Sequence, residues 1–285
     1  MMKRILILGA NSQIAKSLIP LFKKNFLLDL YSRKKINLKD KNINTYKLNE
    51  FPQNKNIIAV INCAGPGDPK IHRNKKNIFK IFDTIDNNIL KYIQDNQKIK
   101  YINISTGIVL NIKKTNNMLT KTNFDYVNTK LYLERKHRLL KNLKIYDLRV
   151  FGFFSRYINL NAGFFLSQVL KSIKKNKTLL VDSVNNSRDY IGGYDLYKFI
   201  KKLINKNFSN GAFNLLSKKK TNKFDILKFY KKKYKLHFII QNEKNSSKAN
   251  NKSLVNLNIK KNIHFKPKYD SLKLIKEETK HIYNF

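Results

Sequence analysis

The sequence predicts an α/β protein with a doubly wound parallel sheet and a smaller C-terminal lobe. The first observation is the apolar run Ile5–Leu8, which ends at Gly9 and leads directly into a helical pattern. The second is that short apolar runs alternate with amphipathic helical patterns up to Val150, as expected for parallel strands joined by helices. Beyond Val150 the alternation is irregular. We therefore divide the chain into 1–150, the sheet domain, and 151–285, most of the lobe, which is interleaved with the sheet.

The individual elements follow from the spacing of apolar residues. A run of roughly four to eight apolar residues predicts a buried strand, whereas apolar residues three and four apart indicate the inner face of a helix. The expected strands are Ile5–Leu8, Phe26–Tyr31, Ile57–Asn62, Ile99–Ile104 and Lys144–Val150. The expected helices are Gly9 to about Lys24, Asn77–Ile93, Asp125 to about Lys141, Ala162–Lys174, Gly193–Ile204 and Lys223–Lys232. The polar segment Asn242–Ser253 is interpreted as a loop.

Length and composition restrict the class of protein. A chain of 285 residues can bury a sizeable core, and it contains no apolar run of about 18 residues, so we expect no membrane span. Cys63 is the only cysteine, which excludes an internal disulfide and is typical of a reducing cytoplasm. The five histidines have no metal-ligand spacing, and we interpret them as ordinary surface or helix-face residues. No metal site is expected.

The formal net charge of +41 would suit a nucleic acid or an acidic membrane as partner. However, the lysines occur in short runs along the whole chain, together with many Asn and Ile residues. This joint excess is what an AT-rich genome imposes on exposed positions. We therefore attribute the charge to composition and expect no nucleic-acid partner, although anionic small substrates would be attracted.

One pair of residues has the chemistry of proton transfer. Tyr126 and Lys130 are four positions apart, so they lie on the same face of the predicted Asp125 helix. A phenol has a pKa of about 10, and a neighbouring ammonium favours its ionised form. Thr106 follows the strand Ile99–Ile104, and its hydroxyl would hold a carbonyl oxygen while Tyr126 exchanges a proton with that oxygen. In a lysine-rich chain this spacing alone is a weak signal.

Several segments match, in order, the motifs of one known family. They are Gly9–Ala15, Ile61–Gly65, Ile104–Val109, Tyr126–Lys130, Leu148–Gly152, Ser187–Leu196, Gly211–Leu215 and Phe265–His281. On these segments the chain resembles the extended short-chain dehydrogenase/reductase family of nucleotide-sugar epimerases, dehydratases and ketoreductases. The resemblance implies a Rossmann-type fold, in which 1–150 binds a dinucleotide and 151–285 binds the substrate.

The resemblance also implies the roles of the site residues. Thr106, Tyr126 and Lys130 would be catalytic, and Thr106 and Arg188 would bind the substrate. Arg188 suits a diphosphate, although it could instead form an ion pair with Asp189 or Asp195. The residues expected to bind the cofactor are Gly9, Asn11, Ser12, Gln13, Ile14, Ser32, Arg33, Cys63, Ala64, Gly65, Tyr126 and Lys130.

The glycine-rich turn departs from the family pattern at two positions. Ser12 replaces the glycine at which the backbone approaches the pyrophosphate, and Ala15 replaces the glycine used for helix packing. Ala15 adds only one methyl group. Ser12 obstructs the approach more, but its hydroxyl can itself donate to a phosphate oxygen.

The end of the second strand decides between the two cofactors. NAD binders have an acid there for the ribose 2′-hydroxyl, whereas a basic residue receives the 2′-phosphate of NADP. Ser32 occupies the position of the acid and Arg33 follows it, while Asp29 comes too early in the strand. We therefore expect NADP rather than NAD.

The expected function is NADP-dependent reduction of a keto group on a nucleotide-linked sugar, as in the 4-ketosugar reductases of deoxysugar and surface-polysaccharide biosynthesis. A 4,6-dehydratase is disfavoured, because Gly107 and Ile108 replace its Asp-Glu pair. An NAD-dependent nucleotide-sugar epimerase is the first alternative, and a non-catalytic NADP-sensing or RNA-binding protein of the same fold is the second. By resemblance, the helices Asn77–Ile93 and Asp125–Lys141 would form the interface of a homodimer.

Overall fold

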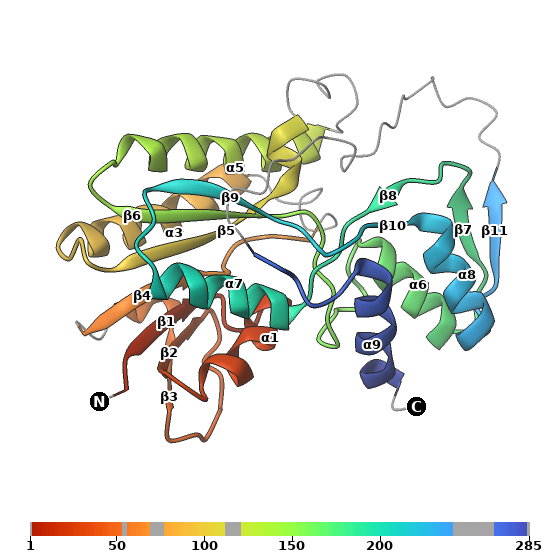
Figure 1. Ribbon diagram of the computed structural model, residues 1–285, viewed down its shortest axis with the longest axis horizontal. Coiled ribbons are helices and arrows are strands. Elements are labelled where there is room, and N and C mark those ends of the chain that lie inside the picture. Colours follow the sequence, from red (N-terminus) through yellow and green to blue (C-terminus); the bar gives the residue numbers. More distant parts are fainter. Residues whose placement is uncertain (1, 53–55, 69–76, 112–120, 242–264, 284–285) are drawn as a thin grey trace.

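A seven-stranded parallel sheet forms the centre of the protein, with the strand order β3-β2-β1-β4-β5-β6-β9 (Figure 1). The computed structural model describes residues 2–52, 56–68, 77–111, 121–241 and 265–283. Helices cover both faces of the sheet, and its order reverses direction at β1. The predicted Rossmann-type α/β fold is therefore confirmed.

Five of the strands lie at or close to their predicted positions. They are β1 (Arg4–Leu8), β2 (Leu27–Ser32), β4 (Ile57–Asn62), β5 (Lys100–Thr106) and β6 (Lys144–Val150). Each is almost entirely buried, because the neighbouring strands and the two helix layers remove both faces and both edges from solvent. The prediction missed β3 (Ile43–Lys47) as a strand, and it gave Gly211–Leu215 as a family motif without assigning it as β9.

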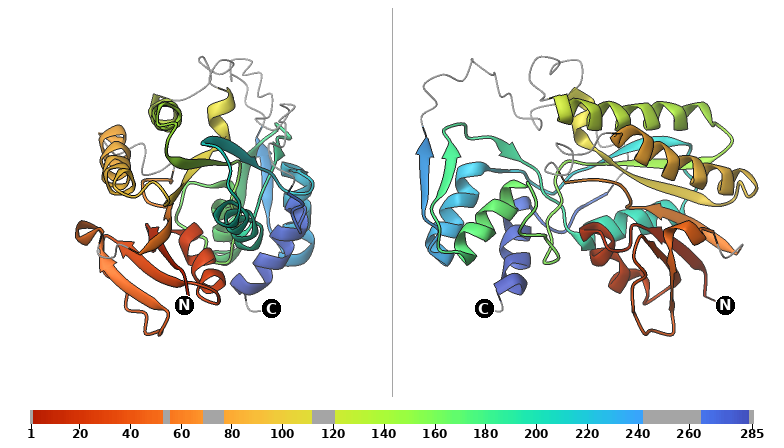
Figure 2. Two further views of the ribbon diagram at one scale, coloured as in Figure 1. Left: turned by 60° about the vertical axis from the view of Figure 1, so that its left-hand side comes forward. Right: turned by 180° about the vertical axis from the view of Figure 1, so that it is seen from behind.

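In the described part of the chain, four helices form the two layers. Helices α1 (Gln13–Phe22) and α7 (Gly193–Asn205) cover one face of the sheet, and α3 (Ile78–Gln94) and α5 (Lys121–Leu139) cover the other (Figure 2). Helices α1 and α7 pack closely, since a Cβ atom on Gly193 would lie 2.7 Å from the Cβ atom of Ser17. The short 3-10 helices η1 (Leu48–Glu50) and η2 (Gly107–Asn111) follow β3 and β5.

A second lobe with its own hydrophobic core lies beside the sheet (Figure 1). Its helices are α6 (Phe165–Lys174), α8 (Lys223–Tyr234) and α9 (Ser271–Tyr283). Two small sheets complete it: parallel β7 (Leu179–Asp182) with β11 (Phe238–Gln241), and antiparallel β8 (Ser187–Arg188) with β10 (Thr221–Asn222). The predicted loop Asn242–Ser253 lies outside the described residues. None of the helices in the described part of the chain is long and apolar enough to cross a membrane.

Candidate active site

Phe82 of α3 brings the predicted catalytic pair next to the predicted cofactor loop. The Nζ atom of Lys130 lies 4.1 Å from the centre of the Phe82 ring, and the Tyr126 ring lies 5.9 Å from it. The same ring covers Gly65, where any Cβ atom would overlap it. Gly65 has a φ of +114°, which an L side chain rarely adopts. Residues from β4, α3 and α5 therefore meet around one aromatic ring.

Lys130 is 4% exposed, which is unusual for a lysine. Its Nζ atom donates a hydrogen bond of 2.9 Å to the carbonyl oxygen of Ile104. Burial lowers the pKa of Lys130 to about 8, although the charges of Asp147, Asp86 and Glu134 act in the opposite direction. The protein holds a desolvated amine here, as functional sites commonly do.

Tyr126 lies in the N-terminal half of α5, and its side chain is partly buried. Burial raises its pKa to about 12, so its hydroxyl is protonated at neutral pH. The expected effect of Lys130, a lowered pKa for Tyr126, is therefore absent in this structure: burial dominates, and the lysine contacts the Ile104 carbonyl group. A protonated phenol is a proton donor.

Thr106 is the last residue of β5, as the apolar run predicts, and it is buried. Its Oγ1 atom accepts a hydrogen bond of 3.4 Å from the amide of Ile108 in η2. The preceding Ser105 donates to Glu134 of α5 at 2.6 Å, and Glu134 also forms a short ion pair with Arg149 of β6. These contacts fix α5, which carries Lys130, against the strand end that carries Thr106.

The turn between β1 and α1 requires a glycine. Gly9 has a φ of +73°, and a Cβ atom there would lie 2.6 Å from the backbone of Cys63 and Ala64. The backbone of the turn that follows β1 is therefore in direct contact with the backbone of the loop that follows β4. Cys63 is half-buried next to this contact, and burial raises the pKa of its thiol to about 12.

The predicted pyrophosphate-binding residues surround the start of α1. Ser12 is the N-cap, and its Oγ atom accepts a hydrogen bond of 3.2 Å from the amide of Ala15. Its hydroxyl hydrogen remains a donor for a phosphate oxygen. Ile14 packs against the core, while the Gln13 side chain donates to Ser155 at 3.4 Å. The first amides of a helix have no partner within the helix and attract anions.

Arg33 is exposed and lines a cavity of about 530 Å³ beside the ends of β1, β2 and β3. Ser32 is buried, and its hydroxyl donates to the carbonyl oxygen of Lys34. Asn11, at 3.5 Å, also reaches the Lys34 carbonyl oxygen. The residues lining the cavity are Leu8, Arg33, Lys47, Leu48, Asn49, Phe51, Thr84, Ile85 and Asn88. They include two cations and no carboxylate.

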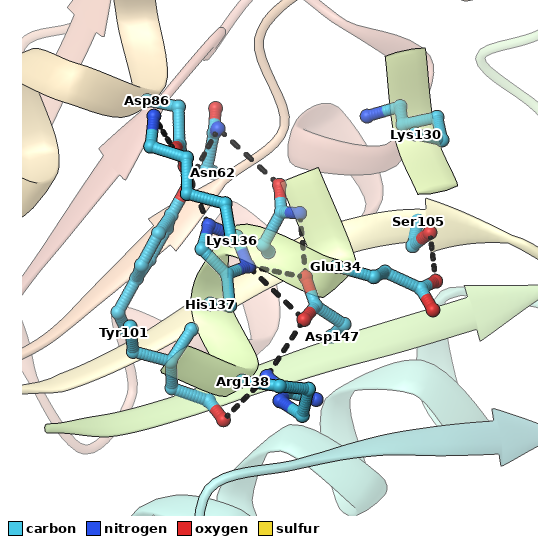
Figure 3. Close-up of polar contacts among 12 residues, drawn as sticks. Asn62, Asp86, Tyr101, Ser105, Lys130, Glu134, Lys136, His137, Arg138 and Asp147 are labelled. Atoms are coloured by element: carbon cyan, nitrogen blue, oxygen red, sulfur yellow. Dashed lines mark hydrogen bonds and ion pairs between the residues drawn. The ribbon is translucent and has the colours of Figure 1, made fainter. Parts of the chain in front are cut away.

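A closed network of buried polar side chains lies between the central strands and helices α3 and α5 (Figure 3). We call it the buried ring; its members are Asn62, Asp86, Tyr101, Asn103, His137 and Asp147. The hydrogen bonds around it measure between 2.8 and 3.4 Å. No member is more than 5% exposed.

His137 supplies the positive charge at the centre of the buried ring. Burial alone would lower its pKa, but Asp147 and Asp86 raise it to about 9, so both ring nitrogens donate to carboxylates at neutral pH. The pKa of each aspartate is in turn held below its usual value, against burial, by His137. The prediction that His137 is an ordinary surface or helix-face histidine is therefore wrong, because its surroundings come from other elements.

Arg188 lies in the second lobe, with its guanidinium group 4.4 Å from the centre of the Phe165 ring. Among the described residues, Arg188 forms no ion pair with Asp189 or Asp195, which was the alternative. Asp189 accepts from the amide of Ser217, and Asp195 accepts from backbone amides at the start of the α9 segment. The Nε atom of Arg188 is buried without a hydrogen-bond partner among the described residues, so its N–H group is an unsatisfied donor.

Sequence reasoning missed three residues of the site. Phe82 was expected only as part of an apolar helix face, and no local pattern distinguishes it. Lys47 belongs to β3, which was not predicted. Asn62 had a readable signal, since it is a polar residue that ends an otherwise apolar buried strand.

Comparison with known proteins identifies the family and the fold of the chain. The sequence profile of the NAD dependent epimerase/dehydratase family matches residues 5–215. No curated protein sequence matches the chain. Among solved structures, UDP-N-acetylglucosamine 4-epimerase from Methanobrevibacter ruminantium M1 is similar, with a TM-score of 0.75 and 13% identity over 99% of this chain and 97% of that one.

Two further structures share the fold. The dTDP-glucose 4,6-dehydratase of Bacillus anthracis str. Ames, in complex with NAD, has a TM-score of 0.74 and 12% identity over 99% of this chain and 97% of that one. RMD from Pseudomonas aeruginosa, complexed with NADPH, has a TM-score of 0.63 and 16% identity over 84% of this chain and 87% of that one. With the profile match over most of its length, the chain belongs to the NAD dependent epimerase/dehydratase family and is an NAD(P)-dependent enzyme of the extended short-chain dehydrogenase/reductase type.

Proposed function

We propose that the protein is an NADP-dependent reductase of a keto group on a nucleotide-linked sugar. The observation that carries this proposal is the convergence of Tyr126, Lys130 and Gly65 on the ring of Phe82. It places a proton donor and a buried cation beside the loop whose backbone is expected to line the cofactor. The absence of an Asp-Glu pair after Thr106, where Gly107 and Ile108 stand, favours reduction over dehydration.

The chain's own residues divide the chemistry among them. When bound, a reduced nicotinamide would supply the hydride at the sugar carbon. Thr106 donates a hydrogen bond to the ketone oxygen, and Tyr126 donates the proton that converts the developing alkoxide into a hydroxyl group. Lys130 packs against the same Phe82 ring as Tyr126, so its positive charge would favour the tyrosinate that remains. Positioned proton transfer of this kind contributes about 10² to 10⁴-fold to the rate.

The choice of NADP rests on the charge of the cavity beside β2. Arg33 and Lys47 line it, Ser32 stands where an NAD binder has an acid, and no carboxylate is among its lining residues. A 2′-phosphate would find cations there, whereas a ribose 2′-hydroxyl would find no carboxylate acceptor.

A fluorescence titration with NADPH and NADH tests the cofactor assignment. We expect NADPH to bind more tightly than NADH, and Arg33→Ala to weaken NADPH by about tenfold or more while NADH changes little. Lys39→Ala, an exposed lysine that does not line the cavity, is the matched control and should bind like the wild type. Tighter binding of NADH would support the NAD-dependent epimerase instead.

For the substrate, we propose that Arg188 binds the diphosphate of the nucleotide sugar. Its buried, unpartnered Nε atom and its position in the second lobe support this assignment. Arg188→Lys keeps the charge but removes the planar fork, so the KM for a nucleotide sugar should rise while the affinity for NADPH stays unchanged.

We also propose a homodimer through α3 and α5. Phe79 and Tyr132 are 46% and 44% exposed, and their rings contact each other at 5.0 Å on this outer surface. A groove of about 360 Å³ beside them is lined by residues of both helices. Tyr132→Glu should shift the mass measured by light scattering from a dimer to a monomer; a wild-type protein that is already monomeric would contradict the assignment.

A further inference from the structure

Asn62 connects the buried ring to the loop that is expected to line the cofactor. It is the last residue of β4 and is 5% exposed. Its Oδ1 atom accepts a hydrogen bond of 3.0 Å from the amide of Ala64. Its Nδ2 atom donates to Tyr101 at 3.1 Å and to Asn103 at 3.4 Å (Figure 3). One carboxamide thus holds the loop on one side and the ring on the other.

The ring fixes the orientation of this carboxamide. Tyr101 passes its own hydroxyl hydrogen to Asp86 at 2.8 Å, so its oxygen is left to accept from Asn62. Asn103 donates its amide hydrogens to Asp147 at 2.8 Å, so its oxygen also faces Asn62. A flipped Asn62 would present its NH2 group to the amide of Ala64 and its oxygen to Asn103 Oδ1. The network therefore allows one orientation, which presents an acceptor to Ala64.

The position of Ala64 in turn determines the turn that precedes α1. The amide of Cys63 donates to the carbonyl oxygen of Leu8 at 3.0 Å, and the backbone of Cys63 and Ala64 occupies the space that a Cβ atom of Gly9 would need. The two loops are consequently packed together without an intervening side chain. A displacement of Ala64 would displace the turn at Gly9 as well.

We propose that Asn62 is a positioning residue for the dinucleotide. By accepting a hydrogen bond from the Ala64 amide, it fixes the loop after β4 and, through it, the turn at Gly9, which are the two backbone segments expected to contact the cofactor. This inference rests on the proposed function, because it needs a dinucleotide in that place. It assigns to the buried ring a role beyond stabilising the contact of α3 and α5 with the sheet. The ring prevents the loops from relaxing when the site is empty.

The register of the sheet provides a matched control. Asn103 is the direct partner of Asn62 on β5, is also buried, and belongs to the same ring, but its side chain bonds Asn62 and Asp147 and not the Ala64 amide. Asn62→Ala and Asn103→Ala should therefore lower the Tm by similar amounts. In Asn103→Ala, Tyr101 and the Ala64 amide still hold the Asn62 carboxamide in the same orientation. We therefore expect Asn62→Ala to weaken NADPH binding by about tenfold, as the loss of one hydrogen bond to a buried group predicts, and Asn103→Ala to weaken it much less. Asn62→Ser, whose hydroxyl can accept from the amide two residues on, should restore most of the affinity.

Hydrogen exchange of the Ala64 amide in the free protein gives a readout that does not depend on the cofactor. We expect this amide to be protected in the wild type, Asn103→Ala and Asn62→Ser, and to exchange faster in Asn62→Ala by at least tenfold. Equal losses of NADPH affinity in Asn62→Ala and Asn103→Ala, or unchanged affinity in Asn62→Ala despite faster exchange, would overturn the positioning role. If the wild type binds neither NADPH nor NADH while the exchange pattern is as expected, the proposed function fails and the inference falls with it.

Discussion

Replacing Lys130 by methionine should stabilise the free protein while it removes the proposed activity. A pKa lowered from 10.5 to about 8 means that holding the charged amine costs about 3 kcal/mol more in the folded protein than in the unfolded chain. Methionine has nearly the same length and fills the same space against Phe82 without a charge. At pH 7 we therefore expect Lys130→Met to increase the free energy of unfolding by about 2 to 3 kcal/mol.

The sign of the pH dependence follows from the two pKa values. Below pH 8 Lys130 is protonated in both states, and the full penalty applies. Between pH 8 and 10.5 the folded protein has released this proton while the unfolded chain still binds it, so the wild type gains stability as the pH rises. The advantage of Lys130→Met should shrink across this window and vanish near its upper end.

Thermal or urea unfolding of the cofactor-free protein at pH 7, 9 and 10.5 measures this difference. Lys136→Met, six residues along the same helix, is the matched control. The carboxylates of Asp83 and Asp86 raise the pKa of Lys136 against the effect of burial, so its removal should destabilise the protein. A loss of stability in Lys130→Met at pH 7, or a gain that does not change with pH, would refute the reasoning.

Three further predictions concern the ring and the turn. His137→Gln should lower the free energy of unfolding by about 3 kcal/mol below pH 6.5. The contribution of the charged histidine is lost as the pH rises through about 9, so the difference between variant and wild type should disappear in that range. A pH-independent difference in urea unfolding would contradict this. Ser12→Ala removes the acceptor for the Ala15 amide and should cost about 1 kcal/mol in urea unfolding, whereas no change would show that the cap is not stabilising. In Gly9→Ala the new methyl group would sit on a residue with a positive φ and overlap the Ala64 backbone, so the Tm should fall by more than in Ser12→Ala. An equal or smaller fall would argue against the close contact between the turn at Gly9 and the loop after β4.

The sheet could be predicted because its central strands are buried on both faces and therefore read as continuous apolar runs. β3 escaped prediction for the opposite reason: it is an edge strand, and of its residues only Ile43 is buried. Its Tyr46 stacks on Tyr31 of β2 at 5.0 Å, but a single aromatic residue in a polar stretch is not a strand pattern. β9 was recognisable as a motif, yet its place beside β6 depends on contacts across the sheet.

The site was predictable where its residues are close together in the sequence. The spacing of Tyr126 and Lys130 is a local property of a helix, and the sequence places Thr106 at a strand end. The contact of both α5 residues with Phe82 arises from the packing of α3 against α5, which no spacing encodes. The same holds for His137, whose carboxylate partners lie on α3 and β6.

The proposed function depends above all on proton donation by Tyr126, and the rate of NADPH consumption reports this step. NADPH consumption is followed with a panel of 4-keto nucleotide sugars, using wild type and Tyr126→Phe at saturating NADPH. We predict that the wild type oxidises NADPH only when a keto sugar is present, and that Tyr126→Phe binds NADPH normally but turns over about 10² to 10⁴-fold more slowly. A Tyr126→Phe variant as fast as the wild type, or a wild type that binds NADPH and reduces none of the keto sugars, would contradict it.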